Sequence, residues 1–363
     1  MMPVVRVLSF TVLGRAALAI AAGAQTMSFE EYDPPSSLVV PEHRVTRAKY
    51  PFIDVHSHQS LGANYERLSK EMDAMNMRVM VNLSGRSGDA LASALRNAQT
   101  TAAGRFVFFA NLQFSGIDDP SWGQSAAAQL ERDVEAGARG LKIFKNLGLD
   151  LKDRSGKRVP VDDPRLDPVW RKAGELRIPV LIHTAEPRQF FDPHDKNNER
   201  WLEIKERPER ARPPSEYPTW ETIIAEQHRV FRKHPRTIFI NAHLGWLGGD
   251  LARLGALMDS LPNMYTEIGA VLAELGRQPR FARQFLVKYQ DRVLFGKDSY
   301  RPDEYHTYFR TLETADEYFP YYRRRHAFWR MYGLDLPDEV LKKIYYRNAL
   351  RIIPGLDASA FPR

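Results

Sequence analysis

Four histidines and one aspartate stand at the ends of short apolar runs in this 363-residue chain. The first run, residues 50–55, leads directly into His56-Ser57-His58, and alternation along a strand points these two histidines to the same side. Three later runs end at His183, His243 and Asp298. Imidazole nitrogens and carboxylate oxygens bind divalent transition metals. The pattern therefore predicts a metal site that is assembled from several strand ends.

These residues indicate metal-assisted chemistry. The chain contains no cysteine, which excludes thiolate ligands, disulfides and cysteine nucleophiles. A divalent metal lowers the pKa of a bound water from ~15.7 towards ~7 and so supplies hydroxide at neutral pH. Asp298 is suited to bind the metal and to accept the proton of that water, and His243 to act as an acid–base or electrostatic partner. The H-E-x-x-H, G-x-S-x-G and dinucleotide-binding motifs are absent.

The elements that must position these residues alternate between strands and helices. Amphipathic stretches with apolar residues at three-to-four spacing separate the strands; examples are residues 63–75, 121–136, 220–234 and 250–260. Eight strand candidates end near residues 56, 82, 110, 144, 183, 243, 268 and 298. An open doubly wound sheet would gather its ligands at one switch point, whereas here they follow the first, fifth, sixth and eighth strands. A closed barrel brings all these ends to one face, so we expect an α/β fold, a (β/α)8 TIM barrel.

We expect a single barrel domain, residues 50–354, with long loops after the fifth and eighth strands, residues 187–218 and 299–337. These loops are natural substrate-covering elements, although most of their aromatic side chains are expected to pack against the barrel. A net charge of +7 without a basic module interleaved with aromatic residues does not favour nucleic-acid binding.

The N-terminus has the features of a targeting segment. Arg6 precedes an apolar run, and small residues end at Ala22-Gly23-Ala24, so residues 1–24 resemble a secretory signal peptide. Residues 25–49 form an extended lead-in. Arg15 interrupts the apolar stretch, and we expect no stable membrane span. Export to the periplasm is favoured over a cytoplasmic location.

Four motifs then give the chain a family resemblance. These motifs are FIDVHSH at 52–58, LIHTAE at 181–186, NAHLG at 241–245 and LFGKDS at 294–299. With them the chain resembles the amidohydrolase superfamily, specifically the amidohydrolase-related branch that includes aminocarboxymuconate-semialdehyde-decarboxylase-like enzymes. The resemblance implies that a metal, usually zinc, is held by His56, His58, His183 and Asp298. It also implies that His243 assists catalysis.

Three further predictions have open alternatives. Lys142 lies on the fourth strand, where two-metal relatives carry a carboxylated lysine; the alternative is an ion pair with a nearby carboxylate, and one metal ion is favoured over two. Lys297 and Arg301 either orient an anionic group of the substrate or face a neighbouring strand or solvent. Glu186 and Glu267 either orient a ligand histidine from outside the metal's own shell or cap the following helix.

We expect a metal-dependent hydrolase of the amidohydrolase type. A metal-bound water would attack the carbonyl carbon of an amide, ester or lactone in a small anionic substrate. The alternative is a metal-dependent nonoxidative decarboxylase, a carbon–carbon lyase of the same family. A noncatalytic barrel is disfavoured because the ligand set is complete. Related barrels associate through outer helices, so a homodimer is the default expectation.

Overall fold

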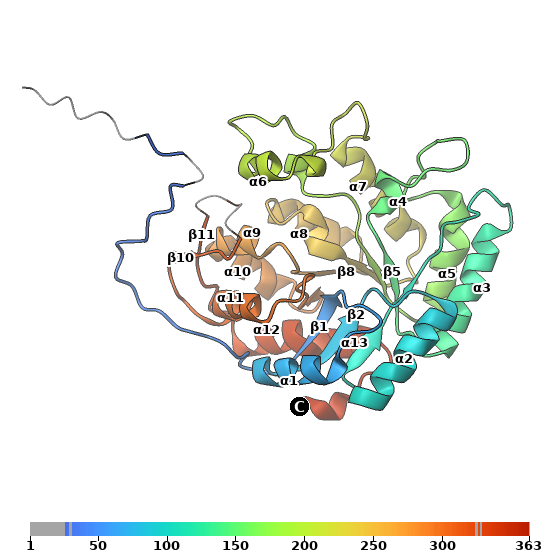
Figure 1. Ribbon diagram of the computed structural model, residues 1–363, viewed down its shortest axis with the longest axis horizontal. Coiled ribbons are helices and arrows are strands. Elements are labelled where there is room, and N and C mark those ends of the chain that lie inside the picture. Colours follow the sequence, from blue (N-terminus) through green and yellow to red (C-terminus); the bar gives the residue numbers. More distant parts are fainter. Residues whose placement is uncertain (1–25, 29–30, 324–325, 327–328, 363) are drawn as a thin grey trace, which may run out of the picture. The chain divides into compact units, whose positions relative to one another are not determined.

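Parallel strands and helices alternate through most of the computed structural model, which describes residues 26–28, 31–323, 326 and 329–362 (Figure 1). The chain divides into an N-terminal unit up to Leu38 and a barrel unit from Val39 to Arg363. The signal peptide predicted for residues 1–24 lies outside the described residues. No described helix is both long and apolar enough to cross a membrane.

The strands are short, buried and parallel. Their bounds are β1 (Phe52–Ser57), β2 (Met77–Asn82), β3 (Phe106–Phe108), β4 (Ala110–Asn111), β5 (Leu141–Ile143), β6 (Val180–Ile182), β7 (Phe239–Asn241), β8 (Met264–Glu267) and β9 (Val293–Leu294). They pair in the orders β1-β2-β3 and β4-β5-β6-β7-β8-β9. β3 and β4 together form one strand of the barrel. The N–H of Phe109 donates to Asn82 O of β2, and the N–H of Ala110 donates to Gly140 O beside β5, so the two parts join their neighbours on either side.

The last strand meets the first. The backbone N–H of Val55 donates to Phe295 O at 3.0 Å, and that of Asp298 donates to His56 O at 2.6 Å. Ser57 and Asp298 form a parallel bridge. Counting β3 and β4 as one, the strands therefore follow one another around a (β/α)8 fold, as the sequence predicts. Each of the eight predicted strands is found.

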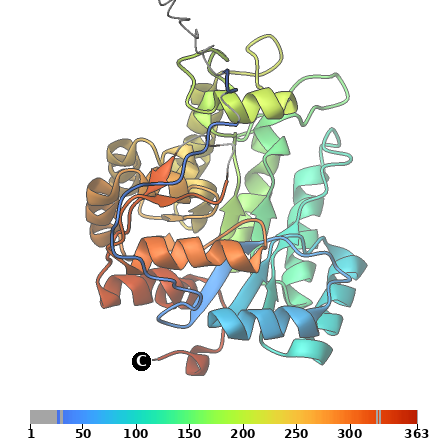
Figure 2. The ribbon, with the colours of Figure 1, turned by 60° about the vertical axis from the view of Figure 1, so that its left-hand side comes forward.

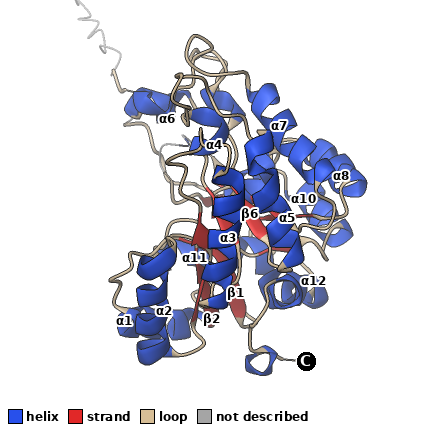
Figure 3. Ribbon diagram, turned by 90° about the vertical axis from the view of Figure 1, so that its right-hand side faces the viewer, coloured by secondary structure: helices blue, strands red, loops and turns tan. Residues whose placement is uncertain are grey.

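Helices cover the outside of the strands (Figure 3). In α1, the sequence determines where the helix begins and ends. The side chain of Asn64 accepts a hydrogen bond from the N–H of Arg67 at the start, and the helix ends at Asn76, whose φ is 70°. All four helices exemplified from periodicity are present. The principal outer helices are α1 (Tyr65–Met75), α2 (Gly88–Ala102), α3 (Trp122–Glu135), α5 (Asp167–Glu175), α7 (Trp220–Lys233), α8 (Leu251–Ser260), α10 (Pro279–Lys288), α11 (Pro302–Glu313), α12 (Asp338–Lys342) and α13 (Asn348–Ile352).

The two long loops carry their own short elements. Residues 187–218 include α6 (Trp201–Glu206), which lies above the strands in Figure 2. Residues 299–337 include α11 and the antiparallel pair β10 (Phe319–Pro320) and β11 (Arg330–Met331). Two shorter helices, α4 (Asn146–Leu149) and α9 (Leu272–Gly276), follow β5 and β8. Tyr305 and Tyr308 of α11 are fully buried, as expected for aromatic residues that pack the loop onto the barrel.

Replacing Phe52 with alanine should destabilise the barrel where its first and last strands meet. Phe52 is fully buried, and its ring lies 4.8 Å from that of Phe295 and 5.4 Å from that of Phe309. We expect Phe52→Ala to lower the free energy of unfolding by about 3–5 kcal/mol in urea titrations. Phe281→Ala is the control, because Phe281 is 43% exposed; a similar loss in both variants would contradict the prediction.

Candidate metal centre

Two histidines from the first strand and the aspartate after the last strand lie together. His56 belongs to β1, His58 follows it, and Asp298 lies beyond β9. The Nε2 atoms of His56 and His58 are each 3.6 Å from Asp298 Oδ1, and the three potential ligand atoms lie within 4.8 Å of one another. This spacing allows one metal ion to be shared among them.

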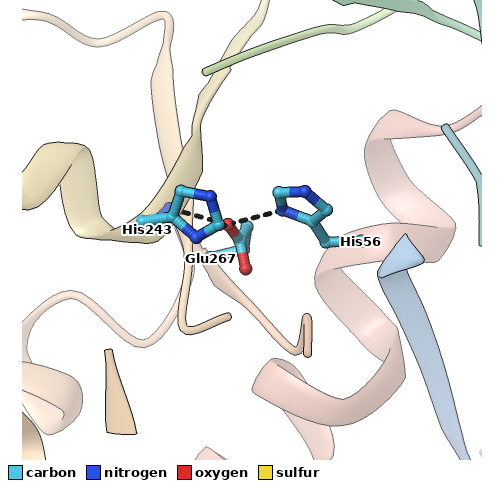
Figure 4. Close-up of side chains that lie close together, drawn as sticks. All are labelled: His56, His243 and Glu267. Atoms are coloured by element: carbon cyan, nitrogen blue, oxygen red, sulfur yellow. Dashed lines mark hydrogen bonds and ion pairs between the residues drawn. The ribbon is translucent and has the colours of Figure 1, made fainter. Parts of the chain in front are cut away.

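The carboxylate of Glu267, at the end of β8, orients His56. The Nδ1–H of His56 donates to Glu267 Oε1 at 3.0 Å (Figure 4). The lone pair of His56 is therefore on Nε2, the atom that faces Asp298. The backbone N–H groups of His243 and Gly269 donate to the same carboxylate at 2.7 and 2.5 Å. Glu267 thus occupies the place of a carboxylate that fixes the tautomer of a ligand histidine.

His243 and His183 form a second pair of imidazoles. The Nδ1–H of His243 donates to Gly269 O at 2.7 Å, which leaves its Nε2 as an acceptor. His183 Nδ1 lies 3.4 Å from that Nε2, so its N–H donates and the lone pair of His183 is on its own Nε2. This Nε2 is buried and has no hydrogen-bond partner among the described residues. A buried nitrogen with a free lone pair suits a metal ligand, although His183 lies outside the three-residue group around Asp298.

Burial sets the protonation of these groups. It lowers the pKa of His183 well below its ordinary value, and burial together with the charge of Lys142 does the same for His56 and lowers the pKa of His58 to about 4. Burial raises the pKa of Asp298, but the nearby imidazoles and Lys142 outweigh it and bring the pKa to about 2. Neutral imidazoles and an ionised carboxylate are the forms that bind a divalent transition metal, so the donor set fits such an ion.

A left-handed turn places His243. Directly after β7, the residues from His243 to Trp246 have φ angles of 53–59°, which only glycine adopts without cost. Gly245 packs so closely against Asn241 that an added Cβ would lie 2.3 Å from Asn241 Nδ2. The indole ring of Trp246 lies 4.6 Å from the imidazole of His243. The turn therefore holds the imidazole between the strand end and this ring.

Lys142 is buried on β5 beside the metal ligands. Its Nζ lies 3.5 Å from His56 Nε2 and 5.4 Å from the ring centre of Phe144. No carboxylate lies within ion-pair distance of Lys142 in the described part of the chain, although the charges of Asp298 and Glu267 act on it from farther away. Burial lowers the pKa of Lys142 to about 8.

Three residues predicted from the sequence lie elsewhere or act differently. Lys297 is fully buried and pairs with Glu304, so of the two alternatives expected for it the structure does not support contact with the substrate. Arg301 has a side chain that is 73% exposed and lies 3.8 Å from the same carboxylate, outside the cavity that contains the metal ligands. Glu186 pairs with Lys145 and Arg212 rather than with a ligand histidine. In each case the side chain lies beside an opposite charge: Glu304 is close in sequence to Lys297 and Arg301, whereas the partners of Glu186 are remote in sequence.

A cavity of about 790 Å³ opens above these residues. His183, His243 and Asp298 belong to its floor, and the two long loops supply most of its walls. Six cationic side chains lie in those walls beside four glutamates, Glu186, Glu203, Glu206 and Glu209; the cations are Lys145, Arg200, Arg207, Arg210, Arg212 and Arg323. Sequence patterns do not identify these cations as cavity residues, because they lie in irregular segments where no periodicity indicates which way a side chain faces.

Buried ion pairs join the two loops. Arg200 pairs with Glu203 at 2.9 Å and with Glu274 at 2.5 Å. Glu203 also pairs with Arg210 and accepts a hydrogen bond from His326 Nε2 at 3.1 Å. Because His326 belongs to the loop after the eighth strand and Glu203 to the loop after the fifth, this cluster fixes one loop against the other above the cavity.

A protein-family model described as "Amidohydrolase" matches residues 46–355 of the chain. The chain belongs to the amidohydrolase family. No curated protein sequence matches it. The family resemblance seen in the four sequence motifs is confirmed.

Solved structures share the fold of this amidohydrolase at low identity. A 2,6-dihydroxybenzoate decarboxylase from Rhizobium is 17% identical with a TM-score of 0.51, covering 84% of this chain and 98% of its own. A dihydroxybenzoic acid decarboxylase from Polaromonas sp. with bound manganese and the inhibitor 2-nitroresorcinol is 15% identical with a TM-score of 0.54, covering 86% and 99%. An uncharacterized TIM-barrel protein from Bordetella bronchiseptica is 17% identical with a TM-score of 0.51, covering 83% and 98%.

Gly245→Ala should destabilise the turn that carries His243. The new Cβ would meet the buried amide of Asn241 in a residue whose φ is 59°, and we expect a loss of about 1–3 kcal/mol in the free energy of unfolding. Gly249→Ala is the matched control, since nothing lies within 4 Å of a Cβ there. Equal stability of the two variants in urea titrations would show that the turn tolerates a side chain.

Removing the charge of Glu203 should weaken the protein at neutral pH more than in acid. Burial raises the pKa of Glu203, but the hydrogen bond from His326 and the charges of Arg200 and Arg210 lower it to about 2, from an ordinary value of 4.5. A lowered pKa adds stability above pH 4.5 that is lost as the pH falls towards 2. We expect Glu203→Gln to cost about 3 kcal/mol at pH 7.

This cost should shrink progressively when urea titrations are repeated below pH 4.5. Glu209→Gln is the control, because the Glu209 side chain is 64% exposed, and it should leave the pH profile unchanged. A cost for Glu203→Gln that is the same at every pH would contradict the assignment.

Proposed function

We propose that this amidohydrolase is a metal-dependent nonoxidative decarboxylase of small carboxylic acids. The observation that carries this proposal is the cavity whose floor bears the donor set and whose walls bear six cationic side chains beside four glutamates. Six cations against four glutamates leave the walls with an excess of positive charge, which attracts carboxylates and can bind them through charge-assisted hydrogen bonds. Two solved structures with this fold, the enzymes from Rhizobium and Polaromonas, are named as decarboxylases of dihydroxybenzoates; their names support the proposal.

The proposed ligands are His56, His58, His183 and Asp298. A divalent cation at this site, zinc by our expectation, would act as a Lewis acid that polarises and orients the oxygen atoms of the substrate. Glu267 keeps the lone pair of His56 directed inward through its hydrogen bond to Nδ1.

His243 is the proposed proton carrier. Its Nδ1–H is held by Gly269 O, so a proton can be taken up only at Nε2, in place of the N–H of His183 that this atom accepts at 3.4 Å. From Nε2 the proton would be delivered to the carbon that loses its carboxylate. The carbon–carboxylate bond breaks to release CO2, and the new carbon–hydrogen bond takes the electron pair that remains. Trp246, packed on the imidazole, limits the access of water to this transfer.

Hydrolysis is the second candidate, and the position of Lys142 favours it. This lysine lies 3.5 Å from His56 Nε2 with no carboxylate partner among the described residues, on the strand where two-metal relatives carry a carboxylated lysine. An ionised Asp298 would accept the proton of an attacking water. A carbonyl carbon of an amide, ester or lactone would then be the target.

The two candidates predict different products from one set of assays. We expect the metal-loaded protein to release CO2 from a member of a panel of aromatic and enoic acids, and chelation followed by added zinc or manganese to abolish and restore this release. His243→Ala should lower turnover about 10²–10⁴-fold with unchanged metal content, whereas His56→Ala should lose the metal. Turnover of lactones, esters or amides without CO2 release would establish the hydrolase instead.

Metal content measured with Lys142→Ala separates the two site types. About one ion per chain in both wild type and variant would exclude a bridging carboxylated lysine. A decrease from about two ions to one would support the two-metal hydrolase.

A further inference from the structure

Arg323 differs from every other cation in the walls of the cavity. It follows Tyr322 in the loop after the eighth strand, it is half-buried, and it lines the same cavity as His183 and His243. Its charge interacts with that of Asp298 on the floor. Within the described ranges, however, no carboxylate forms an ion pair with it.

The remaining cations of the cavity each have a glutamate partner. Lys145 and Arg212 pair with Glu186, Arg200 and Arg210 pair with Glu203, and Arg207 lies 3.7 Å from Glu209. These five side chains are therefore largely neutralised by the protein itself. An anionic ligand gains less from them than from a guanidinium without a counter-charge.

The described neighbours of Arg323 include a tyrosine ring and a lysine that already has a partner. The ring of Tyr322 lies 5.8 Å from the guanidinium carbon of Arg323 and 5.5 Å from Lys297 Nζ. Lys297 is itself neutralised by Glu304. The charge of Asp298 acts on Arg323, and this carboxylate is one of the proposed metal ligands. A bound divalent cation would cancel the attraction between Asp298 and Arg323.

We propose that Arg323 is the specificity-determining residue of this enzyme and binds a negatively charged group of the substrate. A half-buried guanidinium has lost part of its hydration, and a planar carboxylate or comparable anion replaces it through two parallel hydrogen bonds. The proposal rests on the proposed function only in taking this cavity as the active site. The proposal applies to a decarboxylase and to a hydrolase, because in either case residues of the cavity wall select the charge of the substrate while the reaction takes place at the floor.

The test compares two probes of the same size that differ in charge, benzoate and benzamide. Their affinities are measured by calorimetry on the metal-loaded full chain, with elemental analysis of each sample. We expect wild type to prefer benzoate. Arg323→Gln should weaken benzoate binding by about 10–100-fold, the range expected for losing a charge-assisted hydrogen-bonded pair, and change benzamide binding less than about twofold. Arg323→Lys keeps the positive charge but loses the two parallel N–H donors of the guanidinium. Its affinity for benzoate should therefore lie between those of wild type and Arg323→Gln.

Arg301→Gln is the matched control, since it removes an arginine of the same loop whose side chain is 73% exposed and lies outside the cavity lining; it should bind both probes as wild type does. A wild-type protein that binds benzoate no better than benzamide would overturn the proposal. So would an Arg323→Gln variant that keeps the preference for benzoate, or one that loses both probes equally at unchanged metal content. Because these measurements need no turnover, failure to release CO2 would contradict the proposed reaction and leave this result intact.

Discussion

The junction between the first and last strands is the constraint on which the site depends. His56 and Asp298 are separated by more than two hundred residues, yet the N–H of Asp298 donates to His56 O at 2.6 Å. The buried carboxylate of Asp54 reinforces this junction: its Oδ1 accepts the backbone N–H of His56 at 2.9 Å and of Lys297 at 3.1 Å, and its Oδ2 accepts the hydroxyl of Tyr305 at 2.5 Å. The contacts that close the barrel therefore also bring the candidate metal ligands His56 and Asp298 together.

Backbone conformation at the strand ends shows the cost of this arrangement. His243 and Asp298 have φ angles of 59° and 80°, a region that residues with a Cβ avoid at a cost of about 1–3 kcal/mol each. Surrounding contacts offset that cost: Glu267 accepts the N–H of His243, and the missing side chain of Gly296 leaves space for the same carboxylate, 2.3 Å from where a Cβ would be. Residues that leave the strand in this way can turn their side chains toward the barrel mouth while the preceding strand remains regular.

The floor of the site was predictable from the sequence, whereas its walls were not. A histidine or aspartate directly after a buried apolar run must lie at a strand end, and in a barrel all such ends share one face; this reasoning located His56, His183 and Asp298. Long loops carry no period that indicates direction, so Arg323 was missed. The sequence left two directions open for Lys297, and in the structure its ammonium pairs with Glu304 on the helix that follows. Pairings between irregular segments depend on tertiary structure, which local pattern does not encode.

The division between floor and walls also bears on the reaction. In a decarboxylation, negative charge leaves the carboxylate as the carbon–carbon bond breaks, so a cation that binds this carboxylate stabilises the ground state more than the transition state. A wall cation accelerates the reaction only if it binds a group whose charge persists or grows, such as a second acidic oxygen on the substrate. In a hydrolysis the wall has no such restriction, because the charge develops at the attacked carbonyl over the floor. The position of Arg323 in the wall, apart from the imidazoles that would serve the reacting atoms, therefore suits a substrate with an anionic group that is still present in the product.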